Sequence, residues 1–231
     1  MRWRDKFFRD LTGLGADRFL DHKRVADLLA KAGRPTSAAC VSKFIAETEA
    51  AGLLTKVRRG LYGNRMAFPP VDPDEAAGLL RPGAVVSLGR VLGAHGVTNN
   101  PSNVVTCVLP ASMYNNCQLS VSGGFGDFRF HILPDWVVLA GDEDDRLEAG
   151  IDFARATPEK ALVDMAYLAA SPRSAYGSLG NVNDASELDL DRLRRLADAV
   201  GVRDAVEECL DRVAAEDDAE DEDAGRNVFG Y

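Results

Sequence analysis

Apolar residues at helical spacing predict three short helices in the first fifty residues. The first spans residues 3–11. The second begins after Asp21, whose side chain can accept from the free N–H groups of a helix start, and ends at Ala32-Gly33. The third begins after Thr36 or Ser37 and ends near Gly52. The inward positions of these helices are Trp3, Phe7, Phe8 and Leu11, then Val25, Leu28 and Leu29, then Val41, Phe44, Ile45 and Thr48.

Two strand-like runs follow, residues 53–58 and 61–64, and Arg59-Gly60 between them can close a β-hairpin. Helix, turn, helix and hairpin form the layout of a winged helix-turn-helix domain, in which the last helix enters the major groove and the hairpin contacts phosphates. The open alternative is a small helical domain with a solvated basic face. The predicted DNA contacts are Ser37, Ser42 and Lys43 on the third helix and Lys56, Arg58 and Arg59 on the hairpin.

The charge distribution along the chain supports the DNA-binding prediction. Residues 1–68 carry fourteen lysines and arginines against seven acids, a net charge of +7. Because the whole chain carries −9, residues 69–231 carry −16. A local cationic surface attracts phosphates even when the whole molecule is acidic, so the low overall pI does not exclude a nucleic-acid ligand.

The second part of the chain mixes strand and helix patterns, so the predicted fold class is α+β. A proline-rich segment near residues 68–73 marks a domain boundary. We predict strands at 84–86, 104–109, 128–133 and 151–154, a hairpin turn at 123–126, and helices over 88–95, from 158 onward, over 189–199 and from 202 onward. Ser87, Thr157 and Asp189 are the predicted caps.

The domains expected from these patterns are residues 1–68 (winged helix-turn-helix), 69–200 (α+β) and 201–231 (C-terminal helix and acidic tail). The tail has seven acids among residues 216–223, which repel one another and resist folding alone.

Residues with catalytic or metal-binding chemistry are sparse. The three histidines lie far apart, and the four cysteines form no C-x-x-C pair, so neither a metal nor any other cofactor is expected. Glu159, Lys160 and Asp164 could form a nuclease-like acidic site, but a helix start explains them more simply. We therefore expect no enzyme. No apolar run reaches the roughly 20 residues that span a bilayer, and no signal peptide is recognisable, so a cytoplasmic protein without membrane contact is expected.

Three segments in order, residues 57–62, 87–97 and 156–164, resemble antitoxins of the AbiE type, which belong to type IV toxin–antitoxin systems for abortive infection of phage. The resemblance spans roughly residues 20–170. It implies an autorepressor that binds repeats in its own promoter and counteracts a toxin similar to nucleotidyltransferases.

The leading hypothesis is thus a DNA-binding repressor and antitoxin, paired on an inverted repeat of double-stranded DNA. One alternative is a stand-alone winged-helix regulator whose second part senses a ligand or oligomerises. The other is a metal-dependent nuclease built on Glu159, Lys160 and Asp164.

Overall fold

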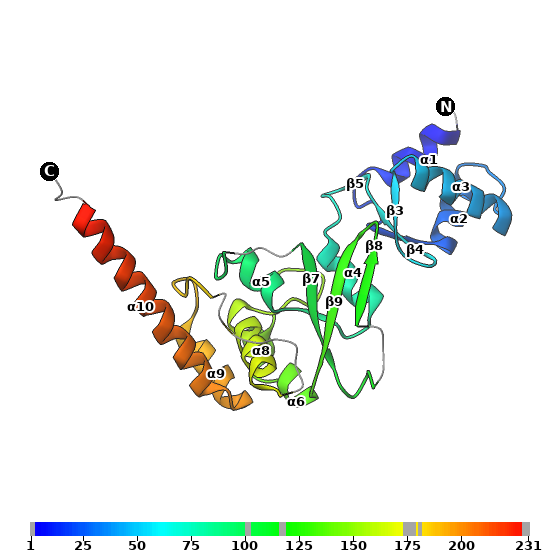
Figure 1. Cartoon of the computed structure of the whole chain (residues 1–231). Helices are drawn as coiled ribbons and strands as arrows, with labels where there is room; N and C mark the ends of the chain where they lie inside the picture. Colours follow the sequence, from blue (N-terminus) through cyan, green and yellow to red (C-terminus); the bar gives the residue numbers. More distant parts are fainter. Residues whose placement is uncertain (1–2, 100–102, 116–118, 173–178, 180–181, 228–231) are drawn as a thin grey trace. The chain divides into compact units, whose positions relative to one another are not determined.

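The chain folds into an α+β protein that divides into two compact units (Figure 1). The first unit comprises residues 1–80 and 121–127, and the second comprises residues 81–120 and 128–231. The computed structural model describes residues 3–99, 103–115, 119–172, 179 and 182–227, together with their side chains except those of 13, 14 and 217–227. Helices and strands occur in both units, so the predicted α+β class is confirmed.

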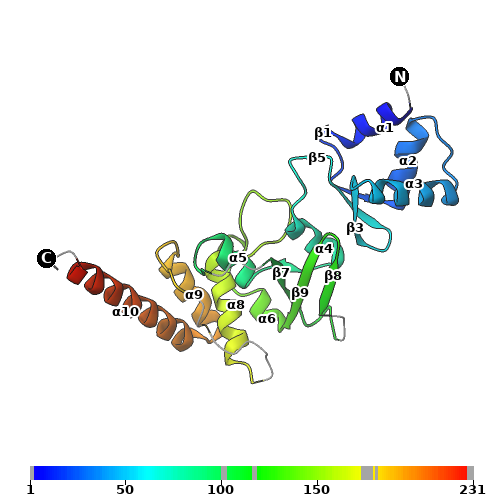
Figure 2. The same ribbon diagram turned by 45° about the horizontal axis from the view of Figure 1, so that its top comes forward.

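The first unit alternates short helices and strands around a small sheet (Figure 2). Its elements are α1 (Trp3–Leu11), β1 (Gly13–Leu14), β2 (Phe19–Asp21), α2 (His22–Lys31), α3 (Ala38–Ala50), β3 (Leu54–Arg58), β4 (Leu61–Asn64), β5 (Ala67–Phe68), the 3₁₀ helix η1 (Pro73–Glu75) and α4 (Ala76–Leu80). The main sheet has the strand order β2-β4-β3, antiparallel throughout, and β1 pairs with β5 in parallel.

Local sequence signals set the helix starts of this unit. The Asp21 carboxylate accepts from the backbone N–H of Arg24 at 2.6 Å, and the Ser37 hydroxyl accepts from that of Cys40 at 3.4 Å. These contacts satisfy donors that have no partner within the helix. The apolar faces of α1, α2 and α3 then close over one core of buried side chains, namely Phe7, Leu11, Leu20, Val25, Leu28, Leu29, Ala32, Val41, Ile45 and Leu54.

The second unit packs helices against a four-stranded sheet of order β6-β7-β9-β8. Its elements are β6 (Val85–Val86), α5 (Gly89–Ala94), β7 (Val104–Pro110), β9 (Gly126–Leu133), α6 (Asp135–Val138), α7 (Glu143–Arg146), α8 (Pro158–Ala170), α9 (Leu190–Val200) and α10 (Arg203–Asn227). The fourth strand, β8 (Ser120–Gly123), pairs with β9, but most of its residues belong to the first unit. The tip of the β8–β9 hairpin, residues 121–127, belongs to the first unit, where the Phe125 ring lies directly against Gly63. A side chain at position 63 would collide with that ring.

Several sequence predictions hold in the second unit. Thr157 accepts from the backbone N–H of Lys160 at 3.2 Å, and Asp189 accepts from that of Arg192 at 3.0 Å, so both predicted caps are confirmed. Gly201 ends α9 in the left-handed region, at φ 71°. The predicted turn near 123–126 is the β8–β9 turn.

Three expectations differ from the structure. Leu88, not Ser87, is the N-cap residue of α5, and it adopts φ 61°, which is unfavourable for a residue with a side chain. Leu88 is fully buried, so packing holds this conformation. Residues 151–154 form no strand; residue pairing there is limited to bridges at Arg155 and Ala156.

The third difference concerns the acidic tail, because the α10 backbone remains helical through residues 216–223. The first half of α10 is anchored by the buried side chains of Val206, Cys209 and Val213. Extending an existing helix requires no new nucleation, which explains how the acidic run continues it. Within the described residues, none of the helices has the length and apolar character needed to cross a membrane.

Candidate functional site

The predicted groove contacts lie on the exposed side of α3. Ser37 sits at its N-terminus, where its hydroxyl caps the helix. The Ser42 hydroxyl lies 3.3 Å from His22 Nε2 at the start of α2, a contact that ties the two helices together. Lys43, the next residue, is exposed. Ala38 and Ala46 are exposed too, and their short side chains add little bulk to this side of the helix. A slim, polar helix face can approach another surface closely.

The β3–β4 hairpin carries the second set of predicted residues. Gly60 takes φ 79° in the turn after Arg59, as a tight turn requires. Lys56 and Arg59 are exposed. Arg58 is also exposed, but its Nε donates to the carbonyl oxygen of Leu79 at 3.3 Å, at the end of α4. Arg58 therefore differs from Lys56 and Arg59, because one of its donors already has a partner within the first unit.

Cations of the first unit fall into two groups. Some are held by acids: Arg18 pairs with Glu75 in a bidentate contact, Arg24 Nε lies 2.6 Å from Asp17, and Lys31 Nζ lies 3.2 Å from Asp10. In the part of the chain that the structure describes, nine exposed cations have no such ion pair: Arg4, Lys6, Lys23, Arg34, Lys43, Lys56, Arg58, Arg59 and Arg65. Their charges remain available to an external anion.

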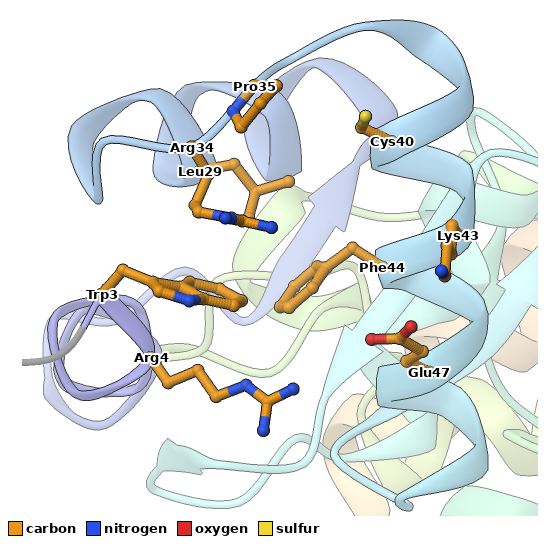
Figure 3. A pocket seen from close by; sticks show the side chains of 9 residues that line it. All are labelled: Trp3, Arg4, Leu29, Arg34, Pro35, Cys40, Lys43, Phe44 and Glu47. Carbon is orange, nitrogen blue, oxygen red and sulfur yellow. The ribbon is translucent and has the colours of Figure 1, made fainter.

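A cavity of about 300 Å³ opens between the start of α1, the α2–α3 turn and one side of α3 (Figure 3). Its wall combines aromatic, aliphatic and charged side chains: Trp3, Arg4, Leu29, Arg34, Pro35, Cys40, Lys43, Phe44 and Glu47. The hydrophobic pattern predicted Trp3 and Phe44 as core residues and gave no indication of this cavity. The sequence carries no local signal for it, because Arg34 lies in the α2–α3 turn and meets Trp3 only in the folded unit.

The second unit contains a buried polar cluster that joins distant segments. The Ser87 hydroxyl donates to Asp164 Oδ2 at 2.8 Å, and the Lys160 ammonium donates to Asp164 Oδ1. Ser87, Lys160 and Asp164 are at most 2% exposed. Burial raises the pKa of the Asp164 carboxyl above its usual range, although Lys160 and Ser87 act in the opposite direction.

Glu159 has a structural partner of its own. One carboxylate oxygen accepts from the backbone N–H of Asp189 at 2.8 Å, and the other lies 3.6 Å from Arg192 Nη1. Glu159 is 3% exposed, so these contacts are buried and connect the start of α8 to the start of α9. Among the described residues, no group of three or more histidine, cysteine, aspartate or glutamate side chains is arranged to hold a metal ion.

Comparison with known proteins is informative for the fold alone. No protein-family model matches the chain, and no curated protein matches it. Among solved structures, the RV2827C protein from Mycobacterium tuberculosis is similar, with a TM-score of 0.57 and 14% sequence identity. The match covers 88% of this chain and 76% of that chain. The shared architecture therefore extends over most of both proteins.

Proposed function

We propose that this chain is a DNA-binding transcriptional autorepressor whose first unit acts as a winged helix-turn-helix domain. The observation that carries the proposal is the order of α2, α3 and the β3–β4 hairpin along the chain, together with the sheet of order β2-β4-β3 that the hairpin strands form with β2. In that domain type the last helix enters the major groove, and the hairpin lies beside the phosphate backbone. Here α3 would be the groove helix, with Ser37, Ser42 and Lys43 as its contacts.

Charge supports the same assignment. Lys56 and Arg59 on the hairpin are exposed and have no acidic partner in the described structure. Arg58 is the weaker candidate for a phosphate contact, because its Nε already donates to Leu79. A pair of protomers on an inverted repeat would double the number of such contacts.

We further propose that the protein serves as the antitoxin of a type IV toxin–antitoxin system and counteracts a nucleotidyltransferase-like toxin. The resemblance to AbiE-type antitoxins rests partly on residues 87–97 and 156–164. The Ser87–Asp164 hydrogen bond brings these two segments into one buried cluster. The burial of Lys160 and Asp164 supports a structural role for the cluster rather than the nuclease alternative.

A salt titration of DNA binding tests the repressor proposal. The full chain should bind a duplex from its own promoter region with a strongly salt-dependent affinity. In Lys56→Ala/Arg59→Ala the slope of log K against log salt should fall by about 1.8, since each lost phosphate contact contributes about 0.9. Arg58→Ala should change the slope by less. Arg195→Ala, in the second unit, is the matched control and should leave the slope unchanged. An unchanged slope in the double variant contradicts the hairpin assignment.

Co-expression separates repression from protection. A toxin-like reading frame beside the gene, expressed from an unrelated promoter, should arrest growth, and the full-length chain should restore it. We expect Lys56→Ala/Arg59→Ala to lose repression of the promoter but still to restore growth, because the toxin is then expressed independently of the operator. Failure of the unaltered chain to restore growth would remove the antitoxin proposal and leave the repressor proposal standing.

A further inference from the structure

The cavity beside α3 combines an aromatic platform with cations that have no acidic partner. Figure 3 shows the Trp3 ring with the Arg34 side chain on one side and the Arg4 side chain on the other. The guanidinium carbons lie 4.7 Å and 5.5 Å from the ring centroid. Phe44 meets the same ring edge-on, at 5.8 Å between centroids. Trp3 therefore holds two guanidinium groups near one opening through cation–π contacts.

The charge balance of the cavity favours an anion. Lys43 also lines it, so three cations face the single carboxylate of Glu47. Among the described residues, neither Arg4 nor Arg34 has an ion pair, and the guanidinium group of each lies over the Trp3 ring. The two positive charges in excess match a dianion. All three cations line one concavity, and a cleft lined by one sign of charge concentrates the counter-ion.

The shape and chemistry of the donors narrow the anion further. Two guanidinium forks and an ammonium approach from different elements, which suits a tetrahedral phosphate better than a planar carboxylate. Leu29, Pro35 and Phe44 add an apolar wall on which a flat ring can pack. A volume of about 300 Å³ lies at the lower end for ligand pockets, so it suits a small molecule rather than a large cofactor.

We propose that this cavity binds a small phosphorylated molecule with a flat ring, of the class of the nucleoside monophosphates, and that an occupied cavity weakens DNA binding. Lys43 couples the two events, because it lines the cavity and is also a proposed groove contact. The ligand and the duplex then compete for the same ammonium group. The regulatory part rests on the proposed DNA-binding function, whereas ligand binding by the cavity does not.

Cys40 gives a direct readout of occupancy. It lies on the cavity wall and is exposed, whereas Cys107 and Cys209 are buried. In the full-length protein, the rate of Cys40 alkylation by N-ethylmaleimide can be followed by peptide mass spectrometry with each of the four nucleoside 5′-monophosphates. At a concentration ten times the dissociation constant we expect alkylation to slow by about tenfold, since the free fraction falls as 1/(1 + [L]/Kd). Adenosine and inorganic phosphate should protect more weakly.

Substitutions on α1 and in the α2–α3 turn provide the matched test. Arg4→Gln/Arg34→Gln should abolish the protection of Cys40 by nucleotides. If the double variant has a much lower melting temperature, Arg34→Gln alone is the milder variant. Lys6→Gln is the control, because Lys6 is an exposed cation of α1 that does not line the cavity. In this variant the nucleotides should protect Cys40 as strongly as in the unaltered protein. Equal protection in Arg34→Gln and the unaltered protein would overturn the proposal.

Duplex DNA distinguishes the two sources of phosphate. Protection by nucleotides, accompanied by a loss of DNA affinity, supports both parts of the proposal. Protection by nucleotides in a protein that binds no DNA supports the cavity and refutes the proposed repressor function. Protection by duplex DNA without any by the nucleotides means that the site takes a backbone phosphate, which overturns the small-molecule proposal. An absence of protection by all four nucleotides at millimolar concentration overturns it as well.

Discussion

The two units use the same cationic residue types in different ways. In the first unit, nine exposed cations have no carboxylate partner among the described residues. In the second unit, cations with a described carboxylate partner include Arg155, Lys160, Arg192, Arg194, Arg195, Arg203 and Arg212. Paired charges cancel at a distance, whereas unpaired ones project a field into solvent. The first unit is therefore suited to attract a polyanion, and the second uses its charges to connect its own segments.

The difference is sharpest at Lys160, which is 2% exposed and bonded to Asp164. Lys160→Met should lower the free energy of unfolding by about 3–5 kcal/mol, because it leaves a buried carboxylate without its partner. Urea denaturation measures the change. Lys160→Met/Asp164→Asn removes both charges and keeps an acceptor for Ser87, so it should recover part of the loss. A double variant no more stable than the single one contradicts a role for the unpaired charge.

Glu159 tests whether the second unit depends on its long-range charge contacts more than on its helix caps. Glu159→Gln should cost about 1.5–3 kcal/mol, since the carboxylate accepts from the backbone N–H of Asp189 and faces Arg192. Thr157→Ala removes only the cap of α8 and should cost about 1 kcal/mol. Thermal melts of the two variants give the order directly. The reverse order would mean that local capping dominates at this position.

His131, on β9, should make the stability of the second unit depend on pH. Burial, with a smaller contribution from Arg129, lowers its pKa from 6.5 to about 4. As the pH falls, the unfolded chain therefore binds a proton at His131 before the folded chain does. The contribution of neutral His131 to the free energy of unfolding is thus fully present above pH 6.5 and is lost between pH 6.5 and pH 4. The decline should reach about 2 kcal/mol at pH 5. His131→Gln should show a correspondingly smaller loss of stability between pH 7.5 and pH 5, and an equal loss in both proteins would contradict the assignment.

Substitution of the unpaired cations should have the smallest effect on stability. Lys23→Gln/Lys56→Gln/Arg59→Gln should change the free energy of unfolding by less than about 0.5 kcal/mol per site, because these side chains have no described partner to lose. Arg192→Gln, whose guanidinium faces both Asp145 and Glu159, is the contrasting variant in the second unit and should destabilise more. Equal losses of unfolding free energy in the two variants would contradict the distinction between unpaired cations in the first unit and paired cations in the second.

The features of the fold that depend on neighbouring residues could be predicted from the sequence. The caps Asp21, Ser37, Thr157 and Asp189 each accept from a backbone N–H three positions later, so their role is visible in a short window of sequence. The Arg59-Gly60 turn is local in the same way. Ser87 shows the limit of such reasoning: it has the composition of a cap, but its hydroxyl donates to Asp164, 77 positions further along the chain.

By itself, then, the sequence determined the helices and hairpin of the first unit, the α+β class and the contrast of charge between the two parts of the chain. The tertiary structure decided which charges are available. It buried Lys160 with Asp164, directed Arg58 Nε at Leu79, and arranged Arg4 and Arg34 around Trp3. The physical reason is that the environment of a charged side chain depends on segments brought together by folding, and desolvation or a partner acts only after they meet.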